Sequence, residues 1–174
     1  QPTKDTLIFA DEAITEGLGP ASRLLLKFGL FFFDYDLDGR LDVLTTNGHI
    51  EDDIEKVQAN VHYRQPAQLF WNGGGNQTFI SATAAEAGED LFQPIVGRGS
   101  AYADFDRDGD LDVVMTQIHG PPLLLRNDQA LGNHWVRLQV IGPEGNPEAI
   151  GAWIHLRTED GRRISRQVMP TKSY

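Results

Sequence analysis

Two nine-residue segments of this 174-residue chain share the pattern Asp-x-Asp-x-Asp-Gly-x-Leu-Asp. The first spans residues 34–42, and the second spans residues 104–112, 70 positions further along the chain. Carboxylates at the first, third and fifth positions of a loop that folds back on itself can converge on one point. The glycine at the sixth position accommodates the left-handed backbone that such a loop requires. The sequence therefore predicts the same acidic loop twice.

Both loops offer only oxygen ligands, which suit a hard cation. Calcium is favoured over magnesium because many flexible protein oxygens are offered at once. The first, third, fifth and ninth residues would contribute carboxylates, and the seventh would contribute its backbone carbonyl. The predicted ligands of two Ca²⁺ ions are Asp34, Asp36, Asp38, Arg40 and Asp42 in the first loop, and Asp104, Asp106, Asp108, Asp110 and Asp112 in the second, with Arg40 and Asp110 acting through their carbonyls.

Three other interpretations of the loops compete with calcium binding. An EF-hand requires a glutamate at its twelfth position, where this chain has Thr45 and Met115, and both loops lead into short β-branched segments rather than helices. An apolar strand that ends in Asp-x-Asp, as at residues 31–36, is also typical of phosphoryl transfer, but a catalytic pair normally occurs once in a domain. The third interpretation is a pair of solvated Asp-Gly turns. Two copies with one acid spacing disfavour it.

Most of the acidity of the chain comes from these loops. With 15 basic and 25 acidic residues the net charge is −10, and nine of the acids lie in the two loops. No run of Lys and Arg is present, so a nucleic-acid partner is not expected. The absence of Cys excludes a disulfide scaffold and a Cys-ligated zinc site. No apolar run approaches the roughly 20 residues of a membrane span, so no span is predicted.

The 70-residue offset extends beyond the loops. It pairs Phe9 with Phe79, Glu16 with Glu86, Gly29 with Gly99, and Leu41-Asp42-Val43 with Leu111-Asp112-Val113. Further along, the offset becomes 55, and it pairs Leu69 with Leu124 and Asn72 with Asn127. The first copy therefore holds 70 − 55 = 15 extra residues. They fall within residues 51–65 and are predicted to form a polar surface loop.

Each copy contains several short apolar segments separated by Gly, Asn and Asp. In the first copy, strands are predicted within residues 24–33 and 41–46 and around residues 69–71 and 78–80. Residues 30–33 are continuously apolar, so both faces of that strand are expected to be covered. Four short antiparallel strands per repeat are typical of a β-propeller blade. The predicted fold class is all-β.

Residues 32–43 and the trailing Leu-Phe-Trp-Asn-Gly at residues 69–73 resemble VCBS/FG-GAP repeats, the blades of integrin α-type propellers. The resemblance implies about two four-stranded antiparallel blades over residues 1–132, each with a calcium loop between adjacent strands. Two blades cannot close a propeller, which takes at least about four. Because Gln1 is not an initiator residue, the chain is expected to be a processed piece of a longer protein. Otherwise oligomerisation or strand exchange would bury its open edges.

The end of the chain resembles a second domain. It is similar to the subgroup related to cartilage acidic protein, in which an ASPIC/UnbV domain follows the propeller. The residues that carry this resemblance are Asn47-Gly48-His49, Gly97-Arg98-Gly99, Asn133-His134-Trp135, Ile150-Gly151-Ala152 and a predicted hairpin over residues 153–169 that turns at Asp160-Gly161. The resemblance implies that residues 133–174 are the N-terminal part of an ASPIC/UnbV β domain.

The resemblance implies a secreted, periplasmic or cell-surface module for adhesion, in which calcium stiffens the loops and the blades present a surface to a protein or glycan partner. The alternative is a non-catalytic propeller part of a larger secreted enzyme or biosynthetic protein, since no catalytic constellation is recognisable. A carbohydrate-binding module is a third option, with Trp71, Trp135 or Trp153 stacking on sugars, although aromatic residues on strands belong more often to a core. Asn76 begins an N-glycosylation sequon.

Overall fold

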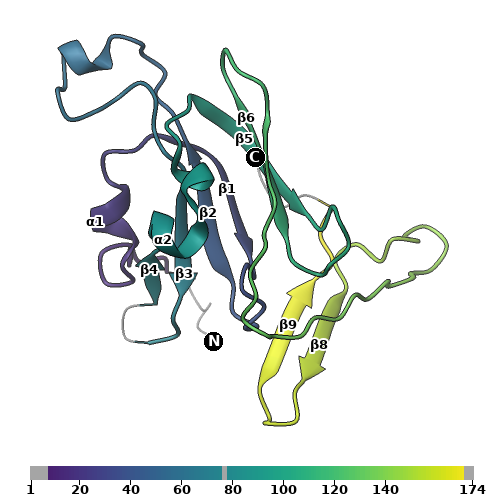
Figure 1. Cartoon of the computed structure of the whole chain (residues 1–174). Coiled ribbons are helices and arrows are strands. Elements are labelled where there is room, and N and C mark those ends of the chain that lie inside the picture. The colour runs from purple at the N-terminus through teal and green to yellow at the C-terminus, as the bar shows by residue number, and fades with distance from the viewer. Residues whose placement is uncertain (1–7, 76–77, 171–174) are drawn as a thin grey trace, which may run out of the picture.

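The computed structural model describes residues 8–75 and 78–170 and consists mainly of antiparallel β-strands (Figure 1). Within these residues the strands form a four-stranded sheet, a three-stranded sheet and a two-stranded hairpin. The predicted all-β class is therefore confirmed at the level of secondary structure. Asn76 of the sequon lies outside the described residues.

The first sheet is a four-stranded antiparallel meander that contains the first acidic loop. Its strands, in spatial order, are β1 (Lys27–Phe33), β2 (Asp42–Asn47), β3 (Gln68–Asn72) and β4 (Phe79–Ser81). The loop joins β1 to β2, which pair from Phe33 and Asp42 at the loop end to Lys27 and Asn47 at the far end. Each strand lies where the sequence predicts one, because the apolar segments are short and bounded by turn residues.

The second sheet contains three strands, in spatial order β5 (Gly97–Ala103), β6 (Asp112–Gln117) and β7 (Leu123–Leu125). The sequence predicts a fourth strand here, and that prediction is wrong for the described part of the chain. The segment after Asn127 does not return along β7 as β4 returns along β3. It runs to the acidic loops instead, where Asn133 donates to a carbonyl of the first loop and Arg137 pairs with a carboxylate of the second.

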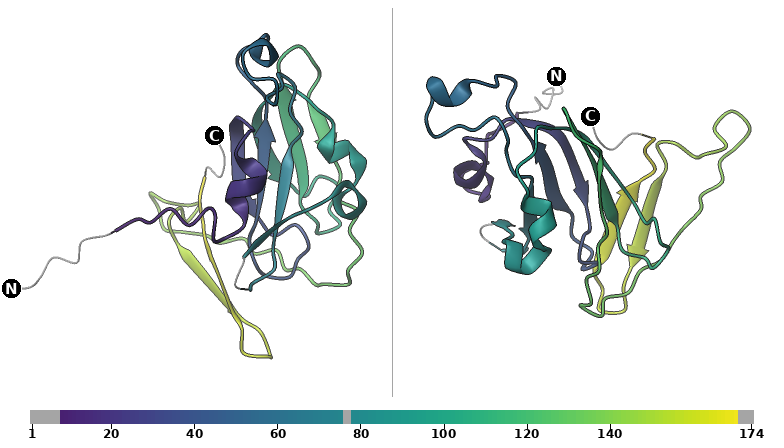
Figure 2. Two further views of the ribbon diagram at one scale, coloured as in Figure 1. Left: turned by 90° about the vertical axis from the view of Figure 1, so that its left-hand side faces the viewer. Right: turned by 45° about the horizontal axis from the view of Figure 1, so that its top comes forward.

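The two sheets pack against each other, and the core lies between them. Strands β1 and β5 are side by side in the views of Figures 1 and 2. The ring of Tyr102 on β5 lies 4.9 Å from that of Phe31 and 5.8 Å from that of Phe33 on β1, centroid to centroid. The buried residues of this core are Phe31, Phe33, Leu44, Ala67, Leu69, Leu91, Ile95, Val113 and Met115.

Two glycines let the backbones of the sheets approach closely. A Cβ atom at Gly29 would lie 2.8 Å from the backbone nitrogen of Ser100, and one at Gly48 would lie 2.5 Å from that of Gly97. Neither position has room for a side chain unless the backbone of the other sheet moves. The guanidinium of Arg98 donates to the carbonyl oxygens of residues 48 and 49, which ties the same edge together.

Strand β1 is covered on only one of its faces. Phe31 and Phe33 are buried in the core, whereas Leu30 and Phe32 are 42% and 51% exposed. The prediction that both faces of residues 30–33 are covered is therefore wrong for the second face. The reason is that, in the part of the chain that the structure describes, another sheet packs against only one of the two faces of the first sheet.

The helices are short and lie outside the two sheets (Figure 1). They are α1 (Leu18–Ser22), α2 (Ala84–Ala87) and two 3-10 helices, η1 (Ile54–Lys56) and η2 (Glu89–Phe92). None of the helices in the described residues has the length and apolar character needed to cross a membrane. The predicted loop at residues 51–65 is mostly exposed, but its Ile54 and Val61 are buried and fasten it to the body.

The C-terminal part forms a hairpin of β8 (Trp153–Arg157) and β9 (Arg163–Gln167). The predicted hairpin at residues 153–169 is confirmed, since Arg157 pairs with Arg163 around the turn. Gly161 in that turn has a φ of 87°, which glycine adopts without steric cost. Among the described residues, no strand is present between β7 and β8.

The core between the sheets is expected to supply much of the stability of the fold. Leu44→Ala removes a fully buried side chain and should lower the free energy of unfolding by about 2–5 kcal/mol. The matched control is Leu131→Ala, which truncates a leucine that is 63% exposed and should change it by less than about 0.5 kcal/mol. Urea unfolding curves of the two variants measure the difference. Equal effects would contradict the placement of the core.

Candidate metal centres

The two acidic loops share the positions of their left-handed residues. Each joins the first two strands of its sheet and contains two residues in the left-handed region, at its fourth and sixth positions. The φ angles are 61° for Leu37 and 90° for Gly39 in the first loop, and 69° for Arg107 and 104° for Gly109 in the second. The repeated sequence pattern thus corresponds to a repeated turn, as the sequence predicts.

The ninth acid of each loop anchors the loop to the sheet. Asp42 accepts a hydrogen bond from the backbone N–H of Tyr35 in the loop (2.9 Å) and one from that of Asn72 on β3 (2.8 Å). Asp112 accepts the equivalent bonds from Phe105 and Asn127, both at 2.8 Å. Both ninth acids are fully buried. Each carboxylate therefore ties its loop to the end of the third strand or to the segment that directly follows it.

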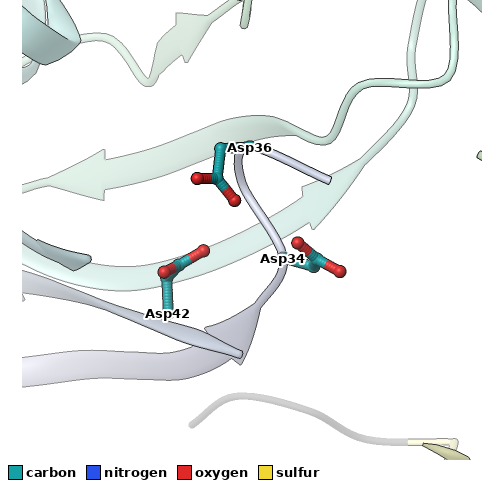
Figure 3. Close-up of side chains that lie close together, drawn as sticks. All are labelled: Asp34, Asp36 and Asp42. Atoms are coloured by element: carbon teal, nitrogen blue, oxygen red, sulfur yellow. The ribbon is translucent and has the colours of Figure 1, made fainter. Parts of the chain in front are cut away.

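In the first loop, three carboxylates lie together (Figure 3). One oxygen of each of Asp34, Asp36 and Asp42 lies within 4.8 Å of the others. Asp36 accepts a hydrogen bond from the indole N–H of Trp71 (2.9 Å), and Asp34 accepts one from the backbone N–H of Gly39 (3.0 Å). The other oxygen of Asp34, Oδ1, is buried and has no hydrogen-bond donor among the described residues.

In the second loop, the acids that lie together are Asp104, Asp106 and Asp108, again within 4.8 Å of one another. The side chain of Asp104 is 8% exposed, and its Oδ2 pairs with the guanidinium of Arg137. Its Oδ1 is buried without a hydrogen-bond donor among the described residues. The same oxygen of the first acid is thus without a donor in both loops.

The remaining predicted ligands are engaged elsewhere through their side chains. Asp38 forms an ion pair with Arg40 and also accepts the backbone N–H of that residue. The Nε atom of Arg40 donates to the carbonyl of Asn72 at 2.6 Å. Asp110 accepts a hydrogen bond from the side-chain amide of Gln129 at 2.8 Å. The structure therefore brings together the first, third and ninth acids in one loop, and the first, third and fifth in the other.

Burial makes the negative charge of these loops costly. Desolvation, together with the charge of Asp38, raises the pKa of Asp34 to about 6. Desolvation raises the pKa of Asp42 to about 7, although the backbone N–H groups of Asn72 and Tyr35 oppose the shift. Burial also raises the pKa of Asp110. Protons are thus retained by carboxyls that a bound cation would hold in the ionised form.

Two asparagines donate side-chain hydrogen bonds to loop carbonyls, and the sequence analysis assigns no role to either of them. The side-chain amide of Asn72 donates to the carbonyl of Leu41 (3.0 Å), within the first sheet. The amide of Asn127 donates across the sheets to the carbonyl of Tyr35 (2.8 Å). Their equivalence in the repeat is the sequence feature that could have indicated a shared structural role. The amide of Asn133 also reaches the first loop, at the carbonyl of Asp36 (2.8 Å).

Arginines from the C-terminal part of the chain lie on both loops. Arg166 on β9 lies 3.5 Å from Oδ2 of Asp34 and donates to the carbonyl of Gly39 (3.3 Å). Arg162 donates to the carbonyl of Asp38 at 3.0 Å, and Arg137 pairs with Asp104 of the second loop. These cations offset part of the repulsion among the acids. The positions of these arginines depend on how distant segments pack, so no local sequence pattern predicts that they lie beside the loops.

A search of protein-family models finds no match to this chain, and a search of curated proteins finds none either.

The raised pKa values give the stability a defined pH dependence when divalent cations are removed. The folded state binds protons more tightly than the unfolded chain, whose aspartates titrate near 3.8. The free energy of unfolding should therefore fall as the pH rises from 5 to 8, through the folded pKa values of Asp34 (about 6) and Asp42 (about 7). Urea unfolding in cation-free buffer measures this dependence.

Asp34→Asn is the control, because it removes one titrating group and keeps an oxygen for the N–H of Gly39. The decline between pH 5 and 8 should be shallower in this variant. A stability that rises over that range would show that these carboxyls are ionised without cost in the folded chain.

Proposed function

We propose that the chain is a calcium-binding module with one site in each acidic loop. The observation that carries this proposal is the buried Oδ1 of Asp34 and of Asp104, which has no donor among the described residues. A buried carboxylate oxygen without a partner is costly, and each one belongs to a carboxylate that is grouped with two others. A hard cation would partner these oxygens, and Asp34, Asp36 and Asp42, or Asp104, Asp106 and Asp108, would hold it.

Calcium would act on these loops through linkage. Four or five acids in a nine-residue loop repel one another until a cation neutralises them, so binding favours the folded state. Extracellular calcium sites typically bind with dissociation constants of about 10⁻⁴ to 10⁻³ M. At ten times the dissociation constant, one site adds about 1.4 kcal/mol to the free energy of unfolding.

The assignment of the sheets to VCBS/FG-GAP propeller blades is part of the same proposal. It is supported by the four-stranded antiparallel order of the first sheet and by the packing of the second sheet onto it. The assignment of residues 133–174 to the start of an ASPIC/UnbV domain is supported by the hairpin of β8 and β9. On this proposal the acidic loops lie at one end of the sheets, and calcium fixes their conformation.

The biological role that we propose is adhesion or scaffolding outside the cytoplasm, in a secreted, periplasmic or surface protein that binds a protein or glycan. In the alternative role, the chain is the non-catalytic part of a larger enzyme. The carboxyls with raised pKa values, Asp34, Asp42 and Asp110, all lie in the predicted metal loops. This placement supports metal binding over acid–base catalysis.

Calorimetric titration with calcium tests the central proposal. The parent chain should bind two ions, and Asp36→Ala and Asp106→Ala should each lose one site, because each removes a carboxylate from one cluster. Asp52→Ala is the matched control, since it removes an exposed acid outside both loops and should retain both sites. In parallel, calcium should raise the melting temperature relative to a chelator.

Two results would contradict the calcium proposal. One is the absence of any binding heat together with identical melting in calcium and in chelator, which would leave the loops as acidic turns. The other is calcium binding that survives in the Asp36→Ala, Asp106→Ala double variant, which would place the ions elsewhere.

A glycan partner is favoured by the exposure of one aromatic residue. Trp153 is 61% exposed on β8, and its ring stacks on that of His155 with an interplanar angle of 11°. The expectation that strand tryptophans belong to a core is therefore wrong for Trp153. Trp153→Ala should abolish binding on a glycan array, whereas Leu138→Ala, an exposed apolar truncation elsewhere, should not. Equal glycan binding by parent and Trp153→Ala would remove this surface from consideration.

A further inference from the structure

The packing of the two sheets within this chain indicates how a further sheet would pack against it. By the 70-residue offset, Leu30 and Phe32 of β1 correspond to Ser100 and Tyr102 of β5. The face of β5 that carries Tyr102 packs on the Phe31 and Phe33 face of the first sheet. The Tyr102 face of the second sheet thus packs on the sheet that precedes it in the chain.

The first sheet carries the same kind of face, and no sheet of the described residues packs against it. Leu30 and Phe32 are about half exposed on β1, although they occupy the positions of the packed residues Ser100 and Tyr102. Exposed apolar side chains side by side on a strand are a feature of interaction surfaces. This surface, which we call the rear face, is defined by Leu30 and Phe32.

The second sheet carries the complementary face, and within residues 8–75 and 78–170 no sheet covers that face either. Ala101 on β5 pairs with Val114 on β6, which pairs with Leu124 on β7, and Leu124 is 62% exposed. The corresponding row of the first sheet is Phe31, Leu44 and Leu69, and that row is buried in the core. We call the surface formed by Ala101, Val114 and Leu124 the front face.

The second sheet also has an open edge at β7. In the first sheet, β4 occupies the equivalent edge of β3, with Trp71 opposite Ile80. By the repeat, β4 corresponds to residues 9–11, because Phe9 corresponds to Phe79, so residues 8–11 contain the equivalent of β4. Ile8 and Phe9 are 83% and 86% exposed, and the segment before α1 projects away from the sheets in the left view of Figure 2.

A single arrangement of neighbouring sheets would cover the rear face and the front face and would also pair the open edge of β7. β4 precedes β5 in the chain and belongs to the sheet onto which β5 packs. By the same relation, residues 8–11 precede β1 and belong to whatever sheet packs on the rear face. If a front face packs on the rear face of this chain, the open edge of β7 in the same sheet therefore lies next to residues 8–11.

We infer that a second copy of this chain is that partner. The front face of one copy packs on the rear face of the next, and residues 8–11 of the latter add a fourth strand to β7 of the former. The contact is heterologous, because different surfaces meet, so each copy retains one free face unless a ring closes. This association involves neither acidic loop and is independent of the proposed calcium binding.

Measuring the mass in solution by light scattering tests the inference. The parent chain should form species that are multiples of 19.3 kDa at micromolar to millimolar concentrations. Phe32→Asp and Leu124→Asp should each be monomeric alone, because each places a charge on one of the two faces. Both side chains are exposed within one chain, so folding should persist, and circular dichroism melting checks it.

Mixing the two variants distinguishes a heterologous contact from a symmetric one. Phe32→Asp retains its front face and Leu124→Asp retains its rear face, so a 1:1 mixture should give a dimer and stop there. A parent that remains monomeric throughout, or assembly that neither substitution affects, would overturn the inference.

The strand pairing has its own test, made clean by the absence of native cysteine. Because Trp71 lies opposite Ile80 in the first sheet, the repeat places Ala10 of one copy opposite Arg126 of the other. Mixed Ala10→Cys and Arg126→Cys chains should form a disulfide-linked heterodimer on mild oxidation. Homodimers from each single variant set the background. A double variant that links residues 10 and 126 within one chain would overturn the intermolecular pairing.

Discussion

The carboxylate at the ninth position of each loop is the interaction on which the rest of the architecture depends. Asp42 and Asp112 are buried, and each accepts one backbone N–H from its own loop. Asp42 accepts another from Asn72 at the end of β3, and Asp112 accepts another from Asn127, two residues after the end of β7. Such a hydrogen bond is worth about 1.5–3 kcal/mol when the carboxyl group is ionised and about 0.5–1.5 kcal/mol when it is neutral. These two side chains therefore fix where each loop begins and ends, which in turn places the other acids.

Placing the acids in this way concentrates negative charge at one end of the sheets. The chain offsets that charge in part with Arg137 and Arg166, which come from segments far away in the sequence. The C-terminal hairpin is consequently held to the loops by polar contacts, with Ile164 also near Gly39. The same arginine contacts therefore attach the hairpin and offset the negative charge of the loop.

The sequence predicts local features of this fold better than it predicts contacts between segments. The Asp-x-Asp-x-Asp-Gly spacing predicts the loops because their turn is set by neighbouring residues. Short apolar segments bounded by Gly, Asn and Asp predict the strands for the same reason. The bond from Asn127 to Tyr35 and the ion pairs of Arg137 and Arg166 depend on how distant segments pack. The missing fourth strand has a similar cause, since the segment after β7 bonds to the loops instead.

Asn127 contacts both loops at once. Its backbone N–H holds Asp112 of the second loop, and its side chain holds the carbonyl of Tyr35 in the first. This residue therefore offers a direct route by which a displacement of one loop can reach the other. If two ions are coupled through it, thermodynamic reciprocity requires each ion to change the affinity for the other by the same factor.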